Sequence, residues 1–233
     1  MSDAIYVIPD IHGHSDKLRD ALALIEAEGG QGARVIFLGD LVDRGPDSRG
    51  VIQTLIDGIA AGRDWIVLRG NHDQLFLDFL DVQGEKAGNH GWLSTNMGGR
   101  ETLASYGVYR RDRDAALRAV PQAHVDLLAG LPHAHETDDL FLCHAGIAPG
   151  VPLTDQHPED LMWIREPFLS DRRDHGKLIV HGHTPVDWPE HHGNRVALDG
   201  GAGWGRALHV AVFEGQEAWL LQAGGRVPLR PGR

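Results

Sequence analysis

Five short apolar runs are spread along the sequence, and polar residues follow each of them. The runs cover residues 5–8, 35–38, 65–68, 140–143 and 178–180. Each is continuously apolar instead of alternating with polar residues, which is typical of strands that are buried on both faces of a sheet. The pattern therefore predicts five central β-strands.

Segments with helical periodicity separate the first three runs. Residues 15–28 place apolar side chains at i, i+3, i+4 and i+7 and stop at a glycine pair, and residues 47–61 and 73–82 are also predicted helices. A strand-helix-strand order predicts parallel strands. Further strands are predicted at 196–198, 207–213 and 218–222, the last two joined as a hairpin around Glu214-Gly215.

Potential metal ligands stand directly after the predicted strands. They are Asp10 with His12, then Asp40, Asn71, His144 and His183. The carboxyl ends of neighbouring strands line one crevice in open α/β sheets, so residues from distant segments can meet there. Carboxylate, amide and imidazole groups are ligands that suit manganese, iron or zinc.

The segments that carry these residues resemble the motifs of a known enzyme family. They are Asp10-Ile11-His12-Gly13, Gly39-Asp40-Leu41-Val42-Asp43-Arg44-Gly45, Arg69-Gly70-Asn71-His72-Asp73, His144-Ala145-Gly146 and His181-Gly182-His183-Thr184-Pro185. Together they are similar to the motif set of the phosphoprotein phosphatase family of binuclear metallophosphoesterases, in the short bacterial and phage form that includes bacteriophage lambda phosphatase. The resemblance covers most of the chain.

This resemblance implies an α/β fold of the calcineurin-like metallophosphoesterase type. Two mixed β-sheets would pack face to face with helices on the outside, as an α/β/β/α sandwich. The 233 residues are 42% hydrophobic and no Pro-rich or Ser-rich linker divides them, so we expect residues 1–233 to form a single catalytic domain.

The resemblance also implies two divalent metal ions, which we expect to be manganese, with iron or zinc as alternatives. The implied ligands of one ion are Asp10, His12 and Asp40, and those of the other are Asp40, Asn71, His144 and His183. His181 would either lie beside the ligands or serve only in packing.

The implied reaction is phosphoester hydrolysis by direct attack of a metal-bridging hydroxide on phosphorus. His72 would be the general acid that protonates the leaving group, and Asp43 would hold its imidazole ring. The substrate phosphate would be bound by arginines, whose planar guanidinium groups match two phosphate oxygens. These are Arg44, Arg69 and Arg165.

Three functions are compatible with these motifs. The first is a serine/threonine protein phosphatase acting on a phosphoprotein or phosphopeptide. The second is a dinucleoside polyphosphate hydrolase of the diadenosine tetraphosphate type, which shares most of the motifs and also has a Trp-Gly pair after the last strand. Asp43 and Thr184-Pro185 favour the first, because such hydrolases tend to differ at those positions. The third, an inactive binding module, would have no need of His72.

The segment 84–99 is the least regular part of the chain. It contains Trp92 and a Gly98-Gly99 pair. It resembles an element of the short bacterial enzymes, and we leave open whether it forms a wall of the substrate groove or a plain loop.

The net charge and the cysteine content disfavour some kinds of binding partner and of covalent cross-link. The net charge of −11 disfavours a nucleic acid bound through its phosphate backbone. Cys143 is the single cysteine, so an intrachain disulfide is impossible, and no leader-like or membrane-spanning apolar stretch is present. We expect a soluble, cytoplasmic protein with no membrane partner and no dedicated regulatory subunit.

Overall fold

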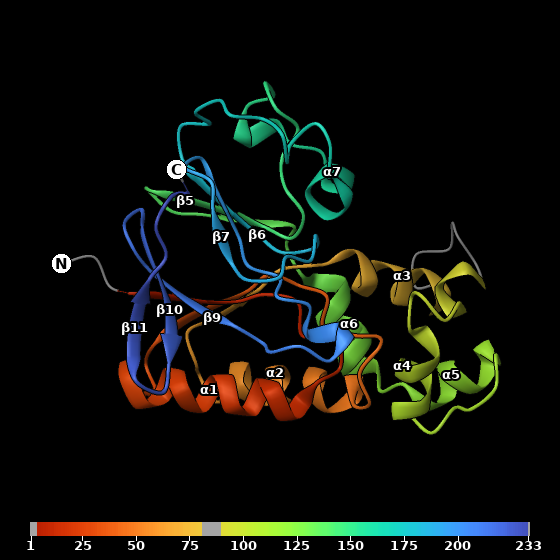
Figure 1. Ribbon diagram of the computed structural model, residues 1–233. Coiled ribbons are helices and arrows are strands. Elements are labelled where there is room, and N and C mark those ends of the chain that lie inside the picture. The colour runs from red at the N-terminus through yellow and green to blue at the C-terminus, as the bar shows by residue number, and fades with distance from the viewer. Residues whose placement is uncertain (1–3, 81–89, 233) are drawn as a thin grey trace.

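The computed structural model describes residues 4–80 and 90–232, and two β-sheets form its centre (Figure 1). The first sheet consists of β1 (Ile5–Ile8), β2 (Arg34–Phe37), β3 (Trp65–Val67), β9 (Val210–Glu214), β10 (Glu217–Gln222) and β11 (Gly225–Pro228). The second consists of β4 (Ala134–Glu136), β5 (Leu140–Cys143), β6 (Leu178–His181), β7 (Glu190–His191) and β8 (Arg195–Ala197). The predicted central strands are all present, within one residue of their predicted limits.

Both sheets are mixed, as the resemblance implied. Their strand orders are β11-β10-β9-β1-β2-β3 and β4-β5-β6-β8-β7. The strands β1, β2 and β3 are parallel to one another, and so are β5, β6 and β8. The outer strands pair antiparallel, including the predicted hairpin of β9 and β10.

Successive side chains along the central strands face opposite layers, and this alternation builds the sandwich. Val7, Ile36 and Leu142 pack between the two sheets. Ile8 and Phe37, one position further along their strands, pack against helices on the other face of the first sheet. Burying one such side chain contributes about 1.5–3 kcal/mol. Both faces of these strands are therefore apolar, which explains their continuous hydrophobic runs.

Helices cover the outer faces of the sheets (Figure 1). They are α1 (Ser15–Gly29), α2 (Ser48–Ala60), α3 (Asn71–Leu80), α4 (Gly99–Ser105), α5 (Arg113–Ala119), α6 (Gln122–Gly130) and α7 (Pro158–Trp163). The described residues also form the short 3₁₀-helices η1 (His90–Leu93), η2 (Leu153–Asp155) and η3 (Ala202–Trp204). Helices α1 and α2 lie under the first sheet, and α7 lies over the second (Figure 1). No helix in the described part of the chain combines the length and apolarity needed to cross a bilayer.

The predicted limits of two elements are wrong. The helix predicted at 73–82 begins at Asn71, because the Asp73 carboxylate, in the first turn, accepts a hydrogen bond from the Gly70 amide at 2.9 Å. Residues 81 and 82 lie outside the described residues. The strand predicted from residue 207 begins only at Val210, where pairing with β10 starts.

The backbones of the loops after β2 and β3 are in direct contact. Gly39 has φ +93°, and a Cβ placed on it would lie 2.3 Å from the Gly70 nitrogen. A Cβ on Gly70 would lie 2.2 Å from the Asp40 nitrogen. These two glycines allow the residues that follow them to come together.

We expect Gly39→Ala to destabilise the protein by about 1–3 kcal/mol more than Gly62→Ala, measured by urea unfolding. Gly62 is the matched control, since it has φ +77° with nothing within 4 Å of an added Cβ. Both variants carry the cost of a positive φ, about 1–2 kcal/mol, but only Gly39→Ala adds a clash with backbone. Equal losses of stability would contradict close contact between the two loops.

Candidate metal centre

All six parallel strands place a polar residue at the same end of the two sheets. These residues are Asp10 after β1, Asp40 after β2, Asn71 after β3, His144 after β5, His183 after β6 and Asp199 after β8. Their side chains are all buried, with at most 9% of any residue exposed. Asp199 is not among the predicted ligands, although it directly follows the strand predicted at 196–198 and so fits the rule that identified the others.

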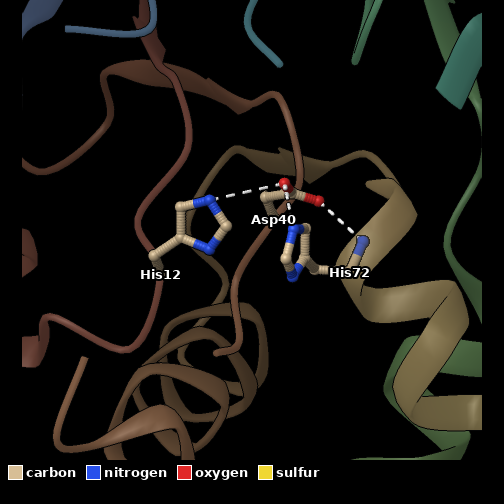
Figure 2. A group of neighbouring side chains, drawn as sticks. All are labelled: His12, Asp40 and His72. Atoms are coloured by element: carbon tan, nitrogen blue, oxygen red, sulfur yellow. Dashed lines mark hydrogen bonds and ion pairs between the residues drawn. The ribbon is translucent and has the colours of Figure 1, made fainter. Parts of the chain in front are cut away.

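Asp40 is the centre of this group. Two triads among the described residues could hold a metal ion, His12-Asp40-His72 and Asp40-His144-His183, and within each triad the ligand atoms lie within 4.8 Å of one another. Asp40 Oδ2 lies 3.5 Å from His12 Nε2, and Oδ1 lies 3.3 Å from His144 Nε2. Figure 2 shows His12 and His72 directed at the Asp40 carboxylate from two sides. A carboxylate shared by two triads is consistent with a binuclear site.

Asp10 and Asn71 lie beside these triads. The Asp10 carboxylate accepts a hydrogen bond from the His183 amide, at 3.0 Å to Oδ1. Asn71 Oδ1 lies 2.9 Å from His144 Nε2 and 3.0 Å from His183 Nδ1. The structure thus brings the six predicted ligands together, but it groups His72 in place of Asp10 with His12 and Asp40. The ligand roles of Asp10 and Asn71 stay predictions.

Backbone carbonyls orient the histidine rings. His12 Nδ1 lies 2.9 Å from the Val42 carbonyl oxygen, and His144 Nδ1 lies 2.9 Å from that of Leu38. Because a carbonyl only accepts, each Nδ1 carries a proton, and Nε2 is the nitrogen that faces Asp40. This is the orientation in which a histidine presents Nε2 to a metal.

The charges in this centre fit a pair of cations. Burial raises the pKa of Asp10 well above its usual range, and repulsion from Asp199 adds to this. Burial lowers the pKa of His144, but the Asp40 charge and hydrogen bond outweigh burial and raise it to about 10, so Asp40 attracts a positive charge at this position, and a metal ion would displace that proton. Acidic groups buried this close together are costly without positive charge between them. Divalent cations would supply that charge.

His183 fits the same conclusion. Its Nε2 is buried and has no hydrogen-bond partner among the described residues. Burial, together with the charge of His144, lowers the pKa of His183 to about 3. The ring is therefore neutral near pH 7, the protonation state that metal binding requires.

His72 and Asp43 form the contact that the sequence predicted. His72 Nδ1 donates to Asp43 Oδ2 at 2.6 Å. The Asp43 carboxylate also accepts from Trp92 Nε1 at 2.7 Å and from the Thr102 hydroxyl at 2.6 Å. Asp43 is fully buried, so these three donors compensate it for the loss of water. They also fix the carboxylate that orients His72.

Trp92 belongs to the described part of the segment 84–99. Residues 84–89 lie outside the described residues. Trp92 is 1% exposed and its ring stacks on Phe76 with centroids 5.2 Å apart. Its indole nitrogen donates to Asp43, so Trp92 supports the carboxylate that holds the predicted general acid, and a role of the segment in the substrate groove stays a prediction.

Arg44 lies at the edge of the centre. One of its guanidinium nitrogens donates to His72 Nε2 at 2.9 Å, and the other contacts His12 Nε2. Its guanidinium carbon lies 4.5 Å from the ring centroid of Trp204. Arg44 is therefore placed where a substrate phosphate would meet the metal ligands, which its predicted role requires.

The other two predicted phosphate-binding arginines differ in their surroundings. Arg69 is buried and donates to the Gln74 side chain and the Ala129 carbonyl, partners that lie outside the ligand set. Arg165 is exposed, and its positive charge contributes to the lowered pKa of His183. The roles of Arg69 and Arg165 in substrate binding stay predictions.

His181 and Asp73 lie close in sequence to predicted ligands but bond to other parts of the protein. His181 Nε2 accepts from Arg195 at 3.2 Å, and its ring packs edge-on against Phe168. Its other ring nitrogen lies 3.1 Å from the Gly182 carbonyl oxygen, and His181 belongs to neither triad. Asp73, to which the sequence analysis gave no role, accepts from the Leu41 amide as well as from Gly70 and so ties the loop after β2 to α3.

Backbone strain is concentrated at this centre. The non-glycine residues with positive φ among those described are His12, Asp40, Asp43, Arg44 and His183. All five are predicted site residues. Such conformations persist only where the surrounding structure enforces them, and they are common at functional sites.

Comparison with known proteins agrees with this centre. The family model described as calcineurin-like phosphoesterase matches residues 4–213. The chain therefore belongs to the calcineurin-like phosphoesterase family, and it is a metal-dependent phosphoesterase.

Curated relatives carry the names of nucleotide hydrolases. The chain is 26% identical over 87% of its length, and 87% of the relative, to a bis(5'-nucleosyl)-tetraphosphatase PrpE [asymmetrical] from Bacillus mycoides. It is 32% identical to a symmetrical bis(5'-nucleosyl)-tetraphosphatase from Vibrio cholerae, over 63% of this chain and 45% of that one.

Solved structures share the fold. The crystal structure of a proposed diadenosine tetraphosphatase has a TM-score of 0.69 at 22% identity and covers 100% of this chain and 96% of its own. A cold-active protein-tyrosine phosphatase from a Shewanella species has a TM-score of 0.59 at 15% identity, over 99% of this chain and 81% of its own.

We expect Asp40→Asn to lower the content of both metal ions, because Asp40 belongs to both triads. His12→Ala removes a ligand from one triad only, so it should retain about half of the metal that the wild type binds. Metal analysis of manganese-loaded protein after gel filtration measures both. Equal losses in the two variants would contradict the bridging position of Asp40.

Proposed function

We propose that this protein hydrolyses dinucleoside polyphosphates of the diadenosine tetraphosphate type. The observation that carries the proposal is the match with a bis(5'-nucleosyl)-tetraphosphatase over 87% of both chains. The likeness in fold to a proposed diadenosine tetraphosphatase, over nearly the full length of both, supports it. These comparisons favour the second function of the sequence analysis over the protein phosphatase that Asp43 and Thr184-Pro185 favoured.

The side chains around the centre have separate tasks in such a reaction. A pair of divalent cations, held by the two triads with Asp10 and Asn71, would activate water and neutralise charge on the phosphoryl group. Arg44 would exchange its contacts with His12 and His72 for a phosphate oxygen of the substrate. Once Arg44 no longer donates to His72 Nε2, that nitrogen can carry the proton that His72 would give to the leaving oxygen, while Asp43 accepts from Nδ1.

The His72-Asp43 contact also supports a second candidate, a serine/threonine protein phosphatase. Cleavage of phosphoserine releases an alkoxide, which must be protonated as it leaves. Cleavage of a polyphosphate releases a nucleotide phosphate, which is a much better leaving group and depends less on an acid. A buried proton donor with a fixed carboxylate therefore suits phosphomonoesters as well.

A substrate comparison tests the proposal. We expect manganese-loaded protein to hydrolyse diadenosine tetraphosphate with a kcat/KM at least about tenfold above that for a phosphoserine peptide, measured by product chromatography and phosphate release. Removing the metal with a chelator should abolish both activities, and added manganese should restore them. A preference for the peptide would overturn the proposal in favour of the second candidate.

We expect His72→Asn to lower kcat on the phosphoserine peptide by about 10²-fold or more, because the alkoxide then leaves unprotonated. On diadenosine tetraphosphate the loss should be smaller, because its leaving group is better. Metal content, measured on the same preparation, should stay near that of the wild type. A large loss of metal would instead make His72 a ligand, as its place in the first triad allows.

A further inference from the structure

Two exposed tryptophans flank the candidate metal centre. Trp163 is 40% exposed and Trp204 is 56% exposed, although most large apolar side chains of the described chain are buried. Exposing an indole ring to water is unfavourable, so a tryptophan that a protein keeps at the edge of a polar site is a candidate binding group.

Trp204 lies on the side of the first triad. The Arg44 guanidinium stacks over its ring at 4.5 Å, and Arg44 in turn contacts His12 and His72. One face of the indole is thereby covered, and the large exposed fraction leaves the rest of the ring open to solvent. A phosphate bound by Arg44 would carry its nucleoside towards this ring.

The loop that carries Trp204 is held in place by other contacts. The Lys17 ammonium, from α1, donates to the Ala202 carbonyl at 2.9 Å and to the Arg206 carbonyl at 2.7 Å. A Cβ on Gly203 would lie 2.5 Å from the His12 ring, so this loop packs directly on a predicted ligand. The loop that carries Trp204 is therefore held in one conformation before a ligand binds, which lowers the entropic cost of ligand binding.

Trp163 lies on the side of the second triad. It is the last residue of α7, and its ring lies edge-on to His183 with centroids 6.2 Å apart. Arg165 follows two residues later in the sequence, on the segment that leaves α7. The Leu161 carbonyl accepts from the Ala145 amide at 2.7 Å, which ties α7 to the loop that carries His144.

The centre thus has one arginine and one tryptophan on each side, Arg44 with Trp204 and Arg165 with Trp163. The loop of Trp204 is tied to α1 through Lys17, and Trp163 is the last residue of α7; α1 lies outside the first sheet and α7 outside the second (Figure 1). A dinucleoside polyphosphate has a matching form, with a base at each end of a chain of phosphates.

We propose that Trp204 and Trp163 form two nucleobase-stacking subsites, each paired with a phosphate-binding arginine, that hold the two ends of a dinucleoside polyphosphate across the metal centre. This inference rests on the proposed function and adds the residues that select the substrate class. Stacking on aromatic rings is tolerant of base identity, so adenine and guanine should both bind.

Equilibrium binding tests the subsites without relying on turnover. Metal-loaded protein is titrated calorimetrically with a non-hydrolysable methylene analogue of diadenosine tetraphosphate, and separately with inorganic tetrapolyphosphate, which has no bases. The ratio of the two affinities reports what the bases contribute. Trp204→Ala and Trp163→Ala should each lower this ratio roughly 5- to 150-fold, the range for loss of one stacked base. Trp204→Phe and Trp163→Phe should retain most of it.

Trp188 supplies the matched control. It is 51% exposed and its ring contacts His209, with centroids 4.7 Å apart. Trp188→Ala should leave the affinity ratio at the wild-type value. An unchanged ratio in both site variants, or an equal fall in Trp188→Ala, would overturn the subsites.

Hydrolysis by the wild type separates this result from the proposed function. If diadenosine tetraphosphate is the preferred substrate and the tryptophan variants keep their affinity ratio, only the subsites are wrong. If the wild type prefers a phosphoserine peptide and its affinity ratio shows no contribution from the bases, the proposed function and the subsites fail together. In a supported case, KM for diadenosine tetraphosphate rises in each alanine variant while kcat changes less.

Discussion

The position of Asp40 connects the fold to the chemistry of the site. Its backbone carbonyl accepts from the Ile11 and His12 amides, and its carboxylate accepts from the His72 amide. Three strand-end loops are thereby fastened to one residue, which itself has φ +51°. The same carboxylate is shared by both candidate metal triads. Because the residue that joins the loops also belongs to both candidate triads, the two triads cannot shift without the loops shifting too.

The candidate metal centre lowers the stability of the fold, and contacts around it compensate for this loss. Buried carboxylates and strained backbone each oppose folding, and both are concentrated around Asp40. The compensation comes from neighbouring residues that never touch a predicted metal. Asp73 accepts two backbone amides, and Trp92 and Thr102 satisfy Asp43. These residues keep the predicted ligands in position, and divalent cations would complete the balance of charge.

A common metal centre explains why relatives in one family act on different substrates. Activation of water and neutralisation of phosphate charge are the same for a phosphopeptide and for a polyphosphate. What differs is the leaving group and what lies beyond it. In the proposed reaction the His72-Asp43 pair would determine how poor a leaving group can be expelled, and in the proposed subsites the exposed rings of Trp163 and Trp204 would hold the ends of the substrate. We therefore expect substrate selectivity to depend on residues around the metal centre and not on the metal ligands themselves.

The sequence by itself determined the central strands, the layered α/β class and the meeting of the six predicted ligands. Strands buried on both faces appear in the sequence as continuous apolar runs, and the carboxyl ends of parallel strands lie at one edge of the sheet. The apolar runs therefore predict both the strands and the place where the residues after them meet. It did not determine the short elements α4 to α7, whose sequences are too brief to show a period. Only the tertiary structure placed Trp92 against Asp43, His181 against Arg195 and Trp204 against Arg44. Each of these depends on how segments far apart in sequence pack together, and no local sequence pattern encodes such a distance.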